Sequence, residues 1–204
     1  MAVFVKPKRF FEDSGTVDPS VSYHVDLENV TNTRGQDMRT MVNLGRYFSI
    51  FAPRQSGKTT FFEEFCFKLA NDPVYVPILL SFQDCKNLQP SRFYSLIQSA
   101  LYDQLVNRFQ AVNCSQLNEI KTCLKNFHLT DHISFRELFE SLNRMVQHKK
   151  IVIFVDEFDG IPRSELENFL TSLRELYQKF KKQPNKALYS VGLVGIRNIT
   201  KLIV

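Results

Sequence analysis

The chain has 204 residues, of which 44% are hydrophobic, and its 26 Lys and Arg against 21 Asp and Glu give a formal net charge of +5. This composition predicts one soluble globular domain with a good-sized core. The positive excess is compatible with anionic ligands, but it is too small to demand a nucleic-acid partner.

Neither a membrane span nor export is supported by the sequence. The apolar runs at 76–80 and 151–155 are far shorter than a bilayer requires, and the start "MAVFVKPKRFF" has no long apolar core for a signal peptide. The cysteines lie far apart, without the C-x-x-C pairs of a zinc site or the density of a disulfide scaffold. We therefore expect a cytoplasmic protein.

The first 45 residues differ from the rest of the chain, with glycine and proline among polar residues and only short apolar patches. We interpret 1–45 as an arm that ends in a lead-in helix at about 37–44. Residues 46–204 then form the core domain.

Four β-rich apolar segments are predicted as strands, and segments with helical spacing separate them. Strands that alternate with helices indicate an α/β fold with a mainly parallel sheet and helices on both faces. The predicted strands are 47–51, 74–80, 151–155 and 188–194.

The helix after the first strand is predicted from Gly57 to about Leu69, because Asn71, Asp72 and Pro73 follow. The long stretch 82–148 must contain several helices to be plausible in a compact domain.

Two later helices carry what resembles a capping box at their start. Ser134 and Glu137 precede one apolar stripe, and Ser164 and Glu167 precede the other. The first stripe consists of Phe135, Leu138, Phe139, Leu142 and Val146. The second consists of Leu166, Phe169, Leu170, Leu173, Tyr177 and Phe180.

The stretch "FAPRQSGKTT", 51–60, follows the first predicted strand and matches a phosphate-binding loop except that Ala52 stands at the first glycine. In such a loop, backbone N–H groups and a helix N-terminus hold phosphate. Gly57 would allow close approach of the backbone, Lys58 would bind the outer phosphates, and the Thr59 hydroxyl would coordinate Mg²⁺. The alternative is a chance match on a solvated turn.

The stretch "KKIVIFVDEFDG", 149–160, is a buried-looking strand that ends in two adjacent carboxylates. At the carboxyl edge of a parallel sheet, Asp156 would hold Mg²⁺ through a water and Glu157 would polarise the attacking water. The alternative is that these acids cap the next helix, and for Asp159 capping is the better interpretation.

Further candidates are weaker. Arg197, after the strand in "LYSVGLVGIRN", would pair with γ-phosphate oxygens or is an ordinary surface arginine. Arg54 and Gln55 would contact nucleotide or a neighbouring subunit, or are solvated. Tyr23 and His24 precede the core and are a further candidate contact for adenine.

With these motifs in place, the chain resembles the AAA-ATPase-like family of P-loop proteins, which is related to the signal-transduction ATPases with numerous domains. The resemblance runs from "SGTVDPSVSYHVDLE" to "SVGLVGIRN", and its most telling part is "PRQ-x-GK-[ST]", since family members often lack the first glycine. It implies a three-layer P-loop NTPase with sheet order 5-1-4-3-2. The nucleotide-binding run it implies is Pro53, Arg54, Gln55, Ser56, Gly57, Lys58, Thr59 and Thr60.

Two features bear on that topology. Pro77 interrupts the second predicted strand, and proline is tolerated mainly in edge strands, which is where the implied order puts this strand. The sequence stops at "ITKLIV", soon after the fourth strand. We expect the last core strand and the C-terminal lid to be missing, with weak nucleotide binding and slow hydrolysis as the result.

The function expected from these motifs is Mg²⁺-dependent binding and hydrolysis of ATP as a regulatory switch. Lys58, Glu157 and Arg197 would serve catalysis, and Thr59 and Asp156 would bind the metal. The expected partner besides ATP is a second copy of the chain or a missing C-terminal effector domain.

Two other classes of function stay open. A small-molecule kinase would need an acid that binds the acceptor, and Asp84 after the second strand is available. A non-catalytic interaction module would use nucleotide only as a structural ligand. Nucleic-acid binding by this chain is not expected, because the basic clusters are short and not interleaved with aromatic residues.

Overall fold

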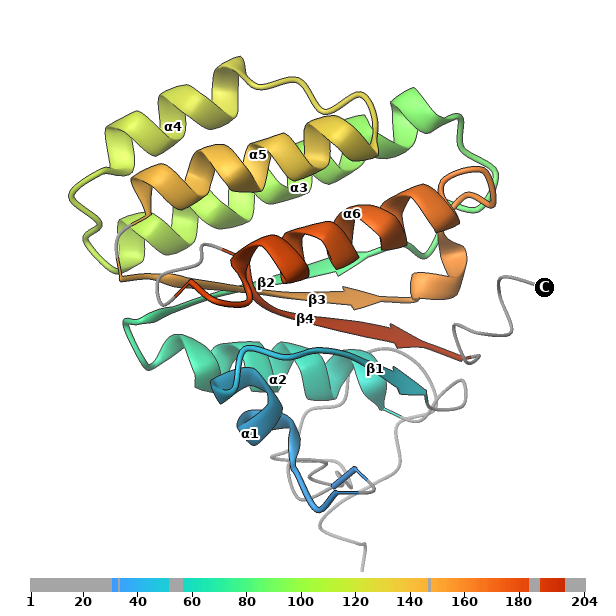
Figure 1. Cartoon of the computed structure of the whole chain (residues 1–204), viewed down its shortest axis with the longest axis horizontal. Helices are drawn as coiled ribbons and strands as arrows, with labels where there is room; N and C mark the ends of the chain where they lie inside the picture. Colours follow the sequence, from blue (N-terminus) through green and yellow to red (C-terminus); the bar gives the residue numbers. More distant parts are fainter. Residues whose placement is uncertain (1–30, 33, 52–56, 147, 184–187, 197–204) are drawn as a thin grey trace, which may run out of the picture.

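A computed structural model describes residues 31–32, 34–51, 57–146, 148–183 and 188–196. Within them lies one four-stranded sheet with the order β1-β4-β3-β2, and all three strand pairs are parallel. Figure 1 shows the strands running side by side with helices above and below them. The α/β class and the parallel sheet predicted from the sequence are confirmed, and the order of these four strands agrees with the 1-4-3-2 part of the implied order.

All four predicted strands are present to within a residue or two at each end. They are β1 (Tyr47–Phe51), β2 (Tyr75–Ser81), β3 (Lys150–Asp156) and β4 (Leu188–Gly195). Their side chains are apolar on both faces because helices cover both faces. On β3, for example, Ile151 and Ile153 belong to one apolar cluster, whereas Val152 and Phe154 belong to the other.

The helices form two layers, one on each face of the sheet (Figure 1). One layer contains α1 (Met38–Asn43) and α2 (Lys58–Ala70). The other contains α3 (Pro90–Ala111), α4 (Leu117–Asn126), α5 (His132–Met145) and α6 (Leu166–Phe180). The lead-in helix, α2, and several helices within 82–148 are therefore confirmed. Met38 and Val42 of α1 are buried against the same cluster as α2, so this helix packs on the core.

Two capping predictions were wrong. The N-cap of α5 is Asp131, whose carboxylate accepts the Ser134 N–H at 2.8 Å, while the Ser134 hydroxyl accepts the Asp131 N–H at 3.0 Å. Ser134 is thus the third helical residue of a capping box rather than its first member. The N-cap of α6 is Glu165, which makes no side-chain capping bond.

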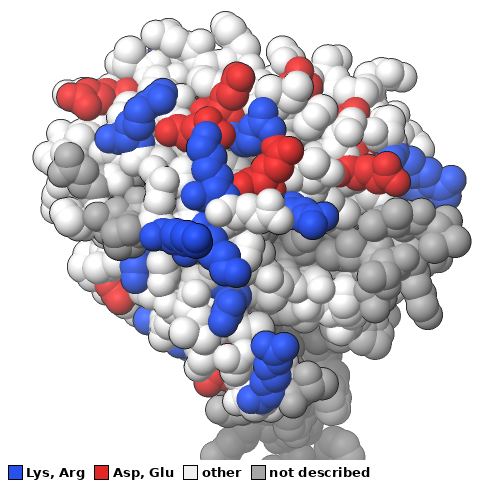
Figure 2. All heavy atoms as spheres, in the orientation of Figure 1, with Lys and Arg blue, Asp and Glu red and all other residues white. Residues whose placement is uncertain are grey.

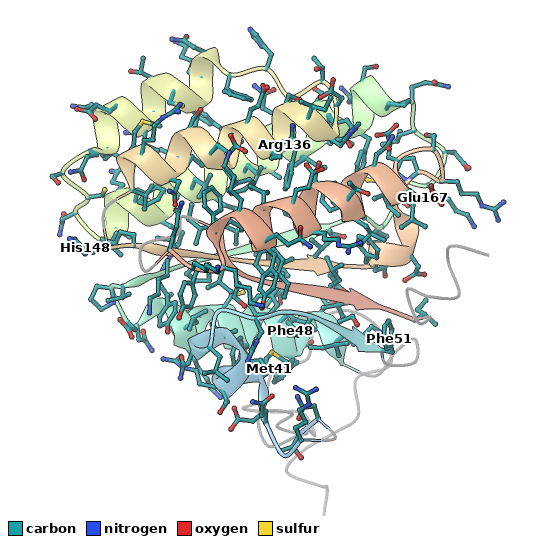
Figure 3. The ribbon with its side chains drawn as sticks, viewed as in Figure 1. Met41, Phe48, Phe51, Arg136, His148 and Glu167 are labelled. Atoms are coloured by element: carbon teal, nitrogen blue, oxygen red, sulfur yellow. The ribbon has the colours of Figure 1, made fainter. Side chains whose placement is uncertain are left out.

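The apolar stripes, which depend on periodicity and not on the caps, are largely confirmed. The five residues predicted for the first stripe, four on α5 and Val146 directly after it, are all buried. On α6, Leu170 and Tyr177 are only partly buried, and the buried Leu176 belongs to the stripe as well. Arg136 of α5, labelled in Figure 3, pairs with Glu175 of α6 and joins the two helices at the surface.

The outer edge of β2 explains how proline is accommodated there. Leu79 donates its N–H to Gln104 Oε1 at 2.9 Å and accepts from Gln104 Nε2 at 2.8 Å, so the backbone groups of Leu79 face α3 and not β3. Pro77 lies two residues earlier and faces the same way, so it removes no hydrogen bond from the ladder with β3. The edge position predicted for this strand is confirmed.

Among the described helices, none combines the length and the apolar character needed to cross a membrane.

All four cysteines are free thiols, and burial raises the pKa of Cys85 and of Cys123.

Candidate functional site

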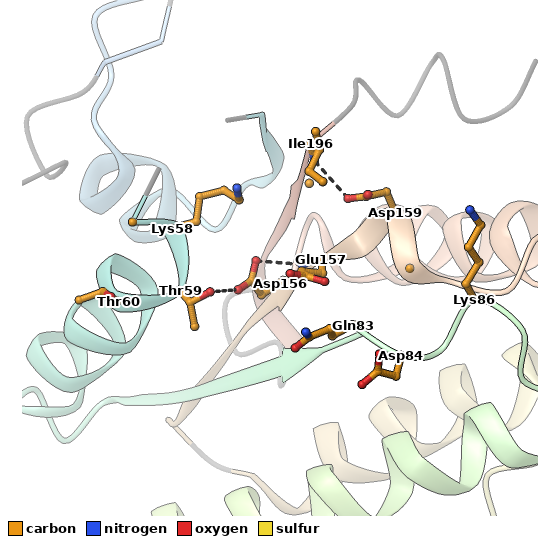
Figure 4. Close-up of a pocket in the computed structure, with 13 residues that line it drawn as sticks. Lys58, Thr59, Thr60, Gln83, Asp84, Lys86, Asp156, Glu157, Asp159 and Ile196 are labelled. Atoms are coloured by element: carbon orange, nitrogen blue, oxygen red, sulfur yellow. Dashed lines mark hydrogen bonds between the residues drawn. The ribbon is translucent and has the colours of Figure 1, made fainter. Parts of the chain in front are cut away.

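A cavity of about 570 Å³ lies at the carboxyl ends of the parallel strands. Its walls come from the start of α2 and from the segments that follow β2, β3 and β4 (Figure 4). In open α/β sheets this edge is where ligands bind. The predicted site residues that line the cavity are Gly57, Lys58, Thr59, Thr60, Asp156 and Glu157. Asp84, considered for the kinase alternative, and Asp159, expected to cap a helix, line it as well.

The two motifs meet in this cavity. The Thr59 hydroxyl donates to Asp156 Oδ2 at 2.7 Å, although the two residues are 97 positions apart in the sequence. Asp156 is the last residue of β3 and is 4% exposed, while Thr59 is in the first turn of α2. The predicted convergence of the loop-to-helix segment and the acids after the third strand is therefore present.

Gly57 ends the loop by adopting a left-handed backbone conformation, with φ of 75°, as the N-cap of α2. Among the described residues, no atom lies within 4 Å of a Cβ built there, and the positive φ by itself favours glycine. Lys58 follows as the first helical residue, and Figure 4 shows its side chain reaching toward the cavity. The positive end of the helix dipole adds to its charge, and both favour an anion.

Glu157 also has a left-handed backbone, with φ of 50°, which is uncommon for a residue with a side chain. This turn directs the Glu157 N–H to Asp156 Oδ1 at 2.8 Å, so both oxygens of Asp156 are held. Such conformations concentrate at functional sites because the surrounding structure must maintain them. Adjacent residues of a strand would point apart, but the turn lets Asp156 and Glu157 line the same cavity.

Asp159 has a role that the sequence did not predict. Its carboxylate accepts the N–H of Ile196 at 3.1 Å, so it connects the turn after β3 with the end of β4. Neither the short 3₁₀ helix η2 (Phe158–Gly160) nor α6 has a side-chain cap, so the expected capping role of Asp159 was wrong. A strand order read from the sequence could have suggested this contact, because β3 and β4 are neighbours.

Gly160 allows the second wall of the cavity to form. A Cβ at this position would overlap the backbone carbonyl of Phe82, which follows β2. Close packing of η2 against that segment brings Gln83, Asp84 and Lys86 to the cavity beside the β3 acids. Sequence reasoning missed Gln83, Lys86 and Gly160, and their position at the end of a parallel strand was the available signal.

The residues present suit a small hard cation. The Thr59 hydroxyl and Asp156 Oδ2 lie 2.7 Å apart, so the Thr59 oxygen could ligate Mg²⁺ directly while Asp156 holds the ion through one of its waters. No group of three His, Cys, Asp or Glu side chains forms a metal site within the described residues. Mg²⁺ commonly takes one or two protein ligands and fills the other positions with water and phosphate, so this small set is sufficient.

Several predicted site residues lie outside the described residues. These are Tyr23, His24, Pro53, Arg54, Gln55, Ser56 and Arg197. Their roles stay predictions.

No model of a known protein family matches this sequence, and a search of curated proteins likewise finds no match.

Proposed function

We propose that this chain is a P-loop NTPase core that binds Mg-ATP in the cavity and hydrolyses it as a regulatory switch. The observation that carries the proposal is the 2.7 Å contact between Thr59 and Asp156, next to Lys58 at a helix N-terminus. A helix N-terminus with a lysine favours phosphate, and paired hard oxygens favour Mg²⁺. The strand order is compatible with the family resemblance.

Each residue has a distinct task in the proposed reaction. Lys58 would bind the outer phosphates, and Thr59 and Asp156 would hold Mg²⁺, which when bound neutralises charge on the phosphate oxygens. Glu157 would orient a water and accept its proton as the water oxygen bonds to the γ-phosphorus. The bond from that phosphorus to the β,γ-bridging oxygen breaks, so that ADP and inorganic phosphate result.

The contact between Asp159 and Ile196 supports the switch role. It ties the segment after Glu157 to the end of β4, which leads in sequence to Arg197. Occupancy of the γ-phosphate position would therefore shift the conformational equilibrium of the segment after β4.

A small-molecule kinase is the second candidate, because Asp84 lines the same cavity opposite the start of α2. There it could accept a hydrogen bond from an acceptor hydroxyl. Glu157 beside Asp156 favours water as the acceptor.

Binding is tested by thermal unfolding with and without Mg-ATP. In wild type, ligand at 100 times Kd stabilises the native state by about 2.7 kcal/mol, which raises the midpoint by roughly 5–10 °C. We expect no such rise in Lys58→Ala. The matched control is Lys68→Ala on the same helix, which lies away from the cavity and should keep the full rise. Equal shifts in all three proteins would contradict the assignment.

Hydrolysis is tested by measuring phosphate release without any added acceptor. We expect Glu157→Gln to keep the Mg-ATP thermal shift but to lose at least 100-fold in phosphate release, since general-base catalysis contributes about 10²–10⁴-fold. Asp84→Asn serves as the control and should release phosphate at the wild-type rate. If release requires an added alcohol and Asp84→Asn abolishes it, the kinase is the correct assignment.

A further inference from the structure

A further cavity is a groove of about 520 Å³ along β1, on the side that faces α6. None of its lining residues belongs to the cavity described above. Its apolar lining includes Leu170 and Leu173 of α6 and Leu193 of β4. Figure 3 labels Met41 of α1 and Phe48 of β1, which also line this groove.

One wall of the groove is a sheet edge. The Val191 N–H bonds to the Arg46 carbonyl, so the even-numbered residues of β1 direct their backbone groups to β4. The backbone groups of Ser49 and Phe51 consequently point away from β4. In the part of the chain that the structure describes, no strand pairs with that side of β1.

Three arginines from separate segments line the same groove: Arg34 before α1, Arg46 before β1, and Arg174 on α6. Their side chains are exposed, and within the described residues none of the three forms an ion pair with a carboxylate. Figure 2 shows the wider charge distribution on this face, with acidic side chains mostly in its upper half and mainly basic ones below.

We propose that this groove binds an extended acidic segment of a partner protein, which adds to the edge of β1 as a further strand. Its backbone would pair with the N–H and C=O groups of Ser49 and Phe51, which supply affinity without regard to sequence. Alternate side chains of the segment would point into the groove. Carboxylates among them would pair with the arginines, which supply the selectivity for an acidic partner.

A peptide suits the groove better than a nucleic acid does. A strand edge offers a donor and an acceptor at every second residue, and a peptide backbone satisfies both. A phosphodiester backbone offers only acceptors at its phosphates, so the carbonyls of Ser49 and Phe51 would stay unmatched. The proposal does not depend on the nucleotide site.

The test is fluorescence anisotropy of the full chain with a labelled eight-residue peptide of alternating Val and Glu. The comparison probes are a Val and Lys peptide, the acidic peptide with two central residues replaced by Pro, and an oligothymidine. We expect the acidic peptide to bind at least tenfold more tightly than the other three.

Protein variants separate the two parts of the proposal. Arg46→Glu combined with Arg174→Glu should weaken the acidic peptide at least tenfold and favour the Val and Lys peptide. Ser49→Pro removes an outward N–H that takes no part in the ladder with β4. Added to the wild-type protein it should weaken binding of the acidic peptide, and added to the double arginine variant it should weaken binding of the Val and Lys peptide. Arg163→Glu, on an exposed residue outside the groove, and Lys58→Ala should leave binding unchanged. Thermal unfolding of each variant shows that it is folded.

Three results would overturn the proposal. The first is no binding of the acidic peptide, or equal binding of its proline-containing form. The second is tighter binding of oligothymidine, which would assign the groove to nucleic acid. The third is self-association of the peptide-free chain that Ser49→Pro abolishes, which would assign the edge to a second copy.

Discussion

At Glu157 the left-handed backbone conformation costs the folded state about 1–2 kcal/mol in a residue that carries a Cβ. The cost falls on the residue proposed to activate water, next to the buried carboxylate that Thr59 contacts. The strain and the proposed function thus coincide at Glu157, and substitutions at this residue can separate them.

We expect Glu157→Gly to have a free energy of unfolding about 1 kcal/mol above that of Glu157→Ala, because glycine tolerates a positive φ. Both variants should lack ATP hydrolysis. The control pair is at Glu167, which is exposed in the first turn of α6. There the Glu167→Gly variant should instead be less stable than the Glu167→Ala variant. Urea denaturation measures all four proteins. Glycine less stable than alanine at both positions would argue against a strained Glu157.

At the scale of the elements, the N-terminus of α5 is stabilised by reciprocal hydrogen bonds between Asp131 and Ser134. The hydrogen bond from the backbone N–H of Ser134 is the main reason why the pKa of Asp131 lies below its ordinary value of 3.8. Since the folded-state pKa lies below the unfolded one, the carboxylate contributes stability above the unfolded pKa, and this contribution falls as pH drops through the folded pKa.

We expect Asp131→Ala to lower the free energy of unfolding by about 1 kcal/mol at pH 7, a typical loss for an N-cap. The difference between Asp131→Asn and wild type should shrink as the pH is lowered from 5 to 3, because the amide does not titrate. Chemical denaturation at several pH values gives both quantities. A difference that stays constant across this range would show that the charge of Asp131 plays no part.

For the whole molecule, the sheet connects the two apolar clusters. Phe154 of β3 packs with Phe62 and Phe65 of α2, at centroid distances of 5.2 and 5.6 Å, whereas its neighbours on the strand face the α3 to α6 layer. Gly192 of β4 leaves room for this ring, because a Cβ there would lie 2.6 Å from it. If one helical layer unfolded, one face of the sheet would be exposed to water, and the strands on which the other layer packs would lose stability.

We therefore expect a single unfolding transition with coincident midpoints by near-UV and far-UV circular dichroism. Phe154→Ala should lower the free energy of unfolding by about 3–5 kcal/mol without splitting this transition. Phe67→Ala is the matched control, since Phe67 is 72% exposed and its loss should change stability by no more than about 0.5 kcal/mol. Two separate transitions in the Phe154 variant would mean that the layers fold independently.

The sequence by itself determined the strands, helices α1, α2, α5 and α6, and most of the apolar stripes, because hydrophobic periodicity is a local property of a segment. For 82–148 it indicated only that several helices are present. It also indicated that Lys58, Thr59, Asp156 and Glu157 belong to one sheet edge, since parallel strands end together.

Only the tertiary structure decided what depends on contacts between distant segments. It determined that Asp159 binds the end of β4 and that Gly160 brings the segment after β2 to the cavity. Each of these follows from the relative position of segments that no local pattern encodes. The edge of β1 that no described strand pairs with, and the three arginines beside it, belong to the same class, because charges far apart in the sequence form a surface only once the chain has folded.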